Sequence, residues 1–209
     1  MHGSVPALHI LTNDVVLADP GFVQVATAVM EASGPRIAIH LRATEITARR
    51  LVELSLQLRV VSERTRSWVL VHDRVDIAMV AGVTGAQLTS RSLTVTDARR
   101  IAPTIVLGAS VHVTADAWIT AQSGATFLVA GPPGDVKSEQ AELSQFVRDV
   151  VDATEGCPVI AIGGMTPERA YEMSRSGASG IAAMRGIWLD DAVSATHRYL
   201  ASYDEGLRR

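Results

Sequence analysis

The sequence predicts a (β/α)8 barrel, the TIM-barrel architecture, formed as a single domain by residues 1–209. Short apolar runs rich in Val, Ile and Leu alternate with longer stretches of helical periodicity, and eight such pairs follow one another. This alternation is typical of repeated βα units around a parallel sheet. Runs such as Ile105-Val106-Leu107 are apolar on both faces, as in strands covered by helices on one side and by barrel layers on the other. An open three-layer sheet has the same periodicity, but eight units favour closure.

Each unit supplies one strand and one helix. The apolar runs predict strands at Leu8–Leu11, Arg36–Leu41, Trp68–Val71, Gly85–Leu88, Ile105–Gly108, Phe127–Ala130, Val159–Ile162 and Gly180–Met184. The helical periodicity predicts helices near Gly21–Ala32, Glu45–Arg59, Val75–Ala81, Val95–Arg100, Ala115–Ser123, Gln140–Ala153, Pro167–Ser176 and Asp190–Leu200.

The helix at Pro167–Ser176 has the clearest end signals. Thr166 precedes it and can cap its free amides, Pro167 suits the first helical position, and Gly177 can end it in a left-handed conformation. The sequence therefore places this helix directly after the strand Val159–Ile162.

The composition limits the classes of partner. A net charge of −3 with 19 Lys and Arg residues argues against a broad nucleic-acid surface. No apolar run approaches the ~18 residues of a membrane span, and the first residues do not resemble a signal peptide. Cys157 is the only cysteine, so no internal disulfide requires an oxidising compartment. We expect a cytoplasmic protein that binds neither nucleic acid nor membranes.

The strongest candidate site is a phosphate site after the last two strands. Gly163-Gly164 follows the seventh strand, and glycines let backbone amides approach an anion at the positive end of the next helix. Arg185-Gly186 follows the eighth strand and can add amides and a guanidinium group. The alternative is a tight turn at the glycines and a solvated Arg185. Anion sites after strands seven and eight recur in this fold, which favours phosphate.

Polar side chains also follow the second and third strands. Alternation sends His40 and Arg42 to the same side, opposite Leu41, so both can face the barrel mouth. The third strand runs into His72-Asp73-Arg74. His72 and Asp73 can belong to the site, or Asp73 can form a structural ion pair with its neighbouring arginine, and the sequence leaves both interpretations open.

Three further residues are candidates for substrate binding. Ser110 and His112 follow the fifth strand, although Ser110 is favoured as the cap of the following helix. Lys137 lies in the turn-rich loop after the sixth strand and can bring a cation to the mouth, but a lone loop lysine is usually solvated.

Several other site classes lack their motifs. The sequence has no His/Cys zinc spacing, no P-loop ending in Lys-Ser/Thr and no Gly-x-Ser-x-Gly elbow. A magnesium-pyrophosphate site normally needs two or more acidic or amide oxygens, and Asp73 is the one suitable residue near the mouth. We therefore expect no cofactor and no resident metal.

The ordered motifs along the chain resemble the thiamine-phosphate-synthase/TenI superfamily. The resemblance rests on His72-Asp73-Arg74-Val75-Asp76-Ile77-Ala78, Gly108-Ala109-Ser110-Val111-His112, Val159–Arg169 and Gly177–Ala182. It implies a (β/α)8 barrel that handles the phosphorylated thiazole half of thiamine, and it points to a possible homodimer.

The synthase branch joins a pyrimidine pyrophosphate to thiazole phosphate with magnesium. The resemblance implies Gln-x-Arg-x-Lys after strand two, Asn-Asp after strand three and another Asp after strand four. Arg42 and Asp73 match this pattern. However, Thr44 replaces the lysine, His72 replaces the asparagine, and Ser92 replaces the Asp expected after strand four. A metal held by one carboxylate would bind weakly, so these departures argue against the synthase.

The TenI branch resembles the chain better, and its tautomerase reaction on a carboxythiazole phosphate is a metal-free proton shift. That shift needs an acid/base near neutrality, for which His40 or His72 would replace the branch's own histidine, because Pro132 occupies that place. Arg185 also departs from the small residue usual there. We predict a tautomerase, with a magnesium-dependent synthase, a non-catalytic thiazole-phosphate-binding or regulatory protein, and an enzyme of an unrelated phosphorylated metabolite as alternatives.

Overall fold

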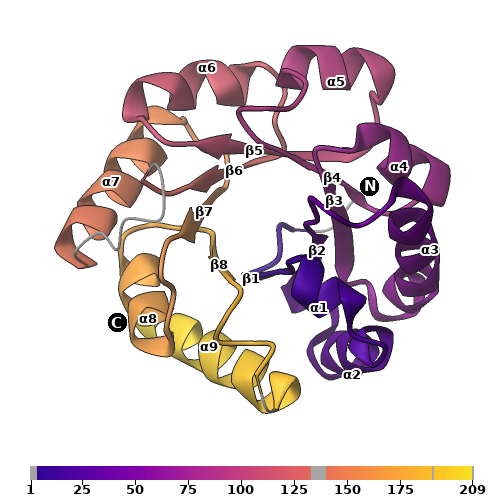
Figure 1. Ribbon diagram of the computed structural model, residues 1–209. Coiled ribbons are helices and arrows are strands. Elements are labelled where there is room, and N and C mark those ends of the chain that lie inside the picture. Colours follow the sequence, from indigo (N-terminus) through magenta and orange to yellow (C-terminus); the bar gives the residue numbers. More distant parts are fainter. Residues whose placement is uncertain (1–3, 133–139, 190, 209) are drawn as a thin grey trace.

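The computed structural model describes residues 4–132, 140–189 and 191–208. Eight parallel strands form a closed barrel in chain order, with the last strand paired to the first (Figure 1). The predicted (β/α)8 barrel is therefore confirmed. The strands are β1 (Leu8–Leu11), β2 (Ile37–Leu41), β3 (Trp68–His72), β4 (Gly85–Leu88), β5 (Val106–Val111), β6 (Phe127–Ala130), β7 (Val159–Ile162) and β8 (Gly180–Ala183).

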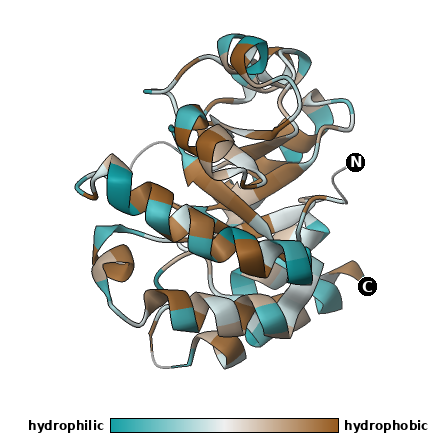
Figure 2. Ribbon diagram, turned by 90° about the vertical axis from the view of Figure 1, so that its right-hand side faces the viewer, coloured by the Kyte–Doolittle hydropathy of each residue, from teal (hydrophilic) through white to brown (hydrophobic). Residues whose placement is uncertain are grey.

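Helices surround the barrel. They are α1 (Asp14–Ala18), α2 (Phe22–Ser33), α3 (Ala48–Thr65), α4 (Val75–Ala81), α5 (Val95–Ile101), α6 (Ala117–Gln122), α7 (Gln140–Ala153), α8 (Pro167–Arg175) and α9 (Ala192–Leu207), with short 3-10 turns η1 (Gly34–Arg36) and η2 (Thr114–Asp116). Figure 2 shows apolar strands inside and helices of mixed hydropathy outside. None of the helices among the described residues is long and apolar enough to span a membrane.

The predicted ends of α8 are confirmed. The Thr166 side chain accepts a hydrogen bond from the Arg169 amide, Pro167 occupies the first turn, and Gly177 has a φ of 82° just beyond the helix. This end geometry matters for the site, because it fixes the turn between β7 and α8.

Several elements differ from the prediction, and two of these differences bear on the loop after β2. The short helix α1 was not expected, and α3 begins at Ala48 rather than Glu45. The reason for the later start is local: Thr47 caps α3, while the amides of Glu45 and Ile46 donate to the carboxylate of Asp14 on α1. Because these two amides donate to Asp14, the Glu45–Ile46 segment stays in the loop before the helix.

The interior of the barrel has its own core. Phe127 is fully buried there, near Trp68 and edge-on to His9. Gly108 makes room for this ring, because a Cβ at Gly108 would lie 2.3 Å from the Phe127 ring and 2.2 Å from the side-chain oxygen of Gln87. The Gly108 motif of the sequence is therefore a packing requirement of the pocket floor.

Candidate functional site

A cavity of about 680 Å³ lies at the carboxyl ends of the strands. This is the end of the barrel at which the sequence placed the candidate residues. The described residues that line it are Leu11, His40, Arg42, His72, Gln87, Thr89, Ser90, Arg91, Ser110, His112, Val129, Pro132, Ile162, Gly163, Gly164, Met165, Ala182, Ala183, Met184, Arg185 and Gly186. Three arginines and no acidic residue belong to this described lining, so it suits an anionic ligand.

The β7–β8 side of the cavity contains the predicted phosphate residues. Gly163 and Gly164 have φ values of 136° and 51°, which side-chain-bearing residues rarely adopt. The Arg169 guanidinium on α8 donates to the Gly163 carbonyl at 3.0 Å and so stabilises the turn between β7 and α8. Arg185 and Gly186 line the same side, and a Cβ at Gly186 would meet the Tyr199 hydroxyl at 2.2 Å. The structure thus brings the four predicted phosphate residues together.

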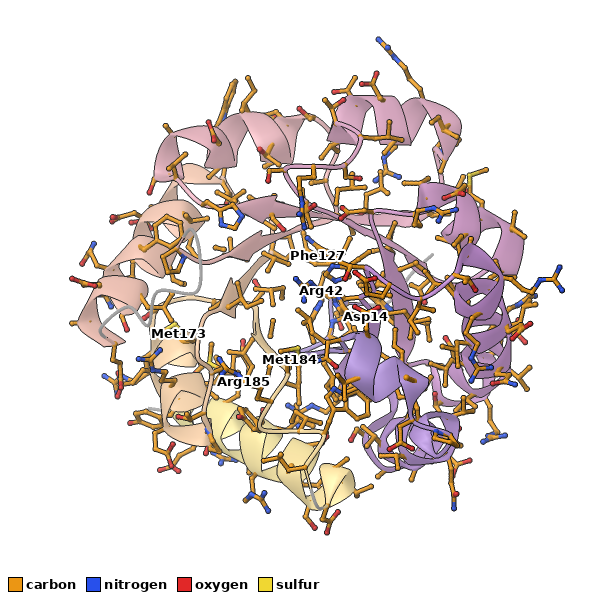
Figure 3. The ribbon with its side chains drawn as sticks, viewed as in Figure 1. Asp14, Arg42, Phe127, Met173, Met184 and Arg185 are labelled. Carbon is orange, nitrogen blue, oxygen red and sulfur yellow. The ribbon has the colours of Figure 1, made fainter. Side chains whose placement is uncertain are left out.

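The β2–β4 side carries a second group of cations. Arg42 follows β2 and Arg91 follows β4, and both line the cavity. Figure 3 places Arg42 over the middle of the barrel and Arg185 toward α8 and α9. Arg91 was not among the predicted site residues, because it lies beyond the end of β4 in a segment without strand alternation.

Asp14 holds the loop that follows Arg42. Its carboxylate accepts hydrogen bonds from the amides of Thr44, Glu45 and Ile46 at 2.8–3.1 Å and from the Thr44 hydroxyl at 2.9 Å. Burial alone would raise the pKa of Asp14, but these hydrogen bonds outweigh it and lower the pKa to about 2. Thr44 therefore anchors this loop to Asp14.

Asp73 has the same role in the loop after β4. One carboxylate oxygen accepts from the Thr89 amide at 2.8 Å, and the other accepts from the Thr89 hydroxyl at 2.9 Å. Asp73 itself has a left-handed φ of 56° and does not line the cavity. The alternative interpretation, an ion pair between Asp73 and Arg74, is absent from the described contacts, since Arg74 pairs with Asp76. Asp73 positions Thr89, Ser90 and Arg91 at the mouth.

His40 and His72 belong to a chain of three histidines. His9 Nδ1 lies 2.8 Å from His40 Nε2, and His40 Nδ1 lies 3.0 Å from His72 Nε2. Burial lowers the pKa of His9 to about 3, of His72 to about 4, and of His40 well below its ordinary value. At neutral pH these rings are uncharged and are weak bases, which makes them poorly suited to the predicted proton shift.

His112 is held differently. Its Nδ1 donates to the carbonyl of Gly131 at 2.9 Å, so the neutral ring leaves Nε2 unprotonated. The ring also lines the cavity, as does Pro132, which follows the Gly131 that His112 contacts. His112, just after β5, therefore lies next to the segment after β6 that carries Pro132.

Ser110 does not cap a helix, which corrects the sequence interpretation. It lies within β5, because that strand continues past Gly108 to Val111, and the following helix starts without a side-chain cap. Its hydroxyl instead accepts from the side-chain amide of Gln87 at 3.2 Å in the cavity. Gln87, which the sequence did not single out, is thus a polar group of the floor. Lys137 lies outside the described residues.

The described lining does not fit a divalent cation. Within residues 4–132, 140–189 and 191–208, no group of three His, Cys, Asp or Glu side chains could hold a metal ion. The one acidic candidate, Asp73, has both oxygens engaged by Thr89. Magnesium prefers carboxylate and water oxygens, whereas this wall of the cavity presents Arg42 and Arg91.

Fold and cavity together define a (β/α)8 barrel with a cationic pocket at the carboxyl ends of its strands. The chain belongs to the thiamine monophosphate synthase (TMP-TENI) family, whose model matches residues 12–187. A thiamine-phosphate synthase of Haloquadratum walsbyi is 34% identical over 187 residues, which cover 85% of this chain and 84% of that protein. One from Pyrococcus horikoshii is 30% identical over 190 residues, covering 89% and 87%.

Solved structures agree with the family. A thiamine phosphate pyrophosphorylase from Pyrococcus furiosus superposes with a TM-score of 0.82 at 25% identity and covers 97% of both chains. A 3-hexulose-6-phosphate synthase, with a TM-score of 0.67 and 15% identity over 94% of this chain and 99% of its own, shares the fold. The relatives named above are synthases, so the comparisons favour the transferase alternative over the predicted tautomerase.

Proposed function

We propose that the protein forms thiamine phosphate by joining a pyrimidine pyrophosphate to thiazole phosphate. The observation that carries this proposal is the presence of two separate cationic regions in one cavity. Gly163, Gly164, Gly186 and Arg185 form one region, and the region around Arg42 and Arg91 lies across the β2–β4 side. A reaction between two phosphorylated substrates needs two such regions.

The chemistry requires little from the protein beyond positioning and charge compensation. A C–N bond forms to the thiazole nitrogen as the bond from the pyrimidine methylene carbon to pyrophosphate breaks. The pyrophosphate leaves with the bonding electrons, so negative charge develops on the leaving group. Fixed cations near that group lower the barrier.

The thiazole phosphate is assigned to the β7–β8 region. Glycine amides at the start of α8 and the guanidinium of Arg185 suit a terminal phosphate. Gln87, Ser110 and His112 lie between the two regions along the strand ends and can contact the rings. The buried, uncharged histidines His40 and His72 complete the floor without competing for either anion.

The direct test is an assay of thiamine phosphate formation from the two substrates, with and without magnesium. We expect product from the wild-type protein and an increase of about tenfold or more in the KM for thiazole phosphate in Arg185→Gln, because a charge-assisted hydrogen bond contributes about 1.5–3 kcal/mol. Arg175→Gln, at the far end of α8, is the matched control and should behave as wild type. The absence of product under both conditions would contradict the proposal.

A tautomerase remains the second candidate because of His112. Because Nδ1 donates to the Gly131 carbonyl, Nε2 is the ring nitrogen left to exchange a proton, and the ring lines the cavity, which suits a proton shift on a carboxythiazole phosphate. If carboxythiazole phosphate isomerises, His112→Gln should abolish the rate, while His72→Gln should retain most of it. Loss of the rate in His72→Gln but not in His112→Gln would instead assign the acid/base role to the buried histidines.

A further inference from the structure

The two arginine-bearing loops of the cavity are built in the same way. In each case a carboxylate from a neighbouring segment accepts hydrogen bonds from the loop. Asp14 on α1 holds the loop after β2, and Asp73, just after β3, holds the loop after β4. The carboxylates therefore face the loops, while Arg42 and Arg91 face the cavity. This arrangement separates the acidic groups from the bound anion.

The distances make Asp73 a poor ligand for a metal ion. Both of its oxygens are within 2.9 Å of donors on the single residue Thr89. A cation bound to either oxygen would compete with Thr89 for it, and the Thr89 hydroxyl also accepts from the Arg91 amide at 3.4 Å. Loss of these contacts would loosen the segment that presents Arg91.

We propose that this chain binds the pyrophosphate group of its substrate through Arg42 and Arg91, with no divalent cation between protein and anion. The inference rests on the proposed function for the identity of the anion. Two guanidinium groups supply two positive charges, the same formal charge as one magnesium ion. Each can form paired hydrogen bonds to phosphate oxygens.

In this arrangement Asp73 is a positioning residue. It acts on the anion through Thr89 and Arg91 and does not contact it. Asn at this position tolerates the left-handed φ of 56°, so Asp73→Asn changes the charge and one hydrogen bond while keeping the backbone. Thr89→Val removes the hydroxyl partner and leaves the Asp73 carboxylate intact.

The experiment is calorimetric titration of the whole protein with inorganic pyrophosphate in buffer containing EDTA, repeated with magnesium. We expect binding in EDTA and no tightening by magnesium. Arg91→Gln should weaken binding by about tenfold or more, as the loss of a charge-assisted contact predicts. Arg100→Gln is the matched control, because Arg100 is an exposed residue of α5 paired with Asp97, and it should bind within about twofold of wild type.

Asp73→Asn and Thr89→Val separate positioning from metal binding. Both variants should weaken metal-free pyrophosphate binding, with folding checked by circular dichroism. If Asp73 were a metal ligand, Asp73→Asn would remove only a magnesium-dependent part of the binding, and Thr89→Val would have no effect. Either of those results, or binding that appears only with magnesium, would overturn the inference.

Product formation is scored separately so that the two proposals can fail independently. Pyrophosphate binding in EDTA that depends on Arg91, without any thiamine phosphate formed, would support the metal-free site and contradict the proposed reaction. Thiamine phosphate formed only with magnesium, together with pyrophosphate binding only with magnesium, would support the reaction and overturn the metal-free site.

Discussion

Replacing Asp14 by Asn should loosen the loop that carries Arg42. The Asp14 carboxylate accepts hydrogen bonds from three backbone amides and one hydroxyl, whereas an asparagine offers one acceptor oxygen and turns an NH2 group toward the loop amides. A hydrogen bond to a charged group contributes about 1.5–3 kcal/mol, but this carboxylate is partly solvated, so we count about 1–2 kcal/mol for the whole set. For a protein of this size that corresponds to a fall in Tm of about 2–8 °C.

The effect of Asp14→Asn should depend on pH. Burial tends to raise the pKa of Asp14, but the loop hydrogen bonds lower it from 3.8 to about 2 in the folded protein. A folded pKa below the unfolded one stabilises the protein above about pH 4, and this contribution is lost as the pH falls toward 2. Urea unfolding at pH 7 and near pH 3 should therefore show a difference between wild type and variant that shrinks in acid.

Asp152→Asn, an exposed change on α7, is the control for this prediction. It removes the same formal charge, so it corrects for any effect of net charge on stability. We also expect Asp14→Asn to weaken anion binding, because Arg42 begins the loop that Asp14 holds. A match between Asp14→Asn and Asp152→Asn in both Tm and anion affinity, or a stability cost that does not diminish at low pH, would contradict a role for Asp14 in holding this loop.

Two further predictions concern the barrel interior. Phe127→Ala should destabilise the protein by about 3–5 kcal/mol in urea unfolding, because the ring is fully buried. The control Leu207→Ala, at the exposed end of α9, should cost less than about 0.5 kcal/mol. A cost near 1 kcal/mol for Phe127→Ala would indicate a loosely packed interior. Burial lowers the pKa of His72 to about 4, so between about pH 6.5 and 4 only the unfolded chain binds this proton, and stability should fall as the pH decreases through that range. His72→Gln should make that dependence shallower, while His9 and His40 retain their share, and an unchanged profile would contradict the buried, neutral ring.

The sequence predicted the barrel well because its strands are locally explicit. Runs such as Val159–Ile162 are apolar on both faces, and the glycines that follow them mark the turns at the mouth. Alternation along β2 was also sufficient to place His40 and Arg42 on one side, and both line the cavity. These features depend on residues close in the chain, which is why they can be read without coordinates.

The missed features depend on contacts between distant residues. The interpretation of Asp73 required knowledge that Thr89, on another loop, engages both of its oxygens. The start of α3 depended on Asp14, and α9 continues past the predicted end at Leu200 because Tyr203 donates to the Ala178 carbonyl. Such contacts follow from closure of the barrel, which local patterns do not specify.

The structural features that distinguish the two candidate reactions also depend on contacts between residues distant in the sequence. The sequence proposed His40 and His72 as bases because they follow strand ends, but closure of the barrel buries them next to His9 and lowers their pKa values. The same closure brings Arg91 to the mouth opposite the predicted phosphate region. Together with the synthase relatives, this moves the proposal from proton transfer to transfer of the pyrimidine group.

In the proposed function, one cavity binds two phosphorylated substrates and joins them. The most direct measurement is the initial rate of thiamine phosphate formation when pyrimidine pyrophosphate and thiazole phosphate are supplied together. The proposal predicts product with saturation in both substrates and a raised KM for thiazole phosphate in Arg185→Gln. No product at saturating concentrations, with or without magnesium, while carboxythiazole phosphate isomerises in the same preparation, would contradict it.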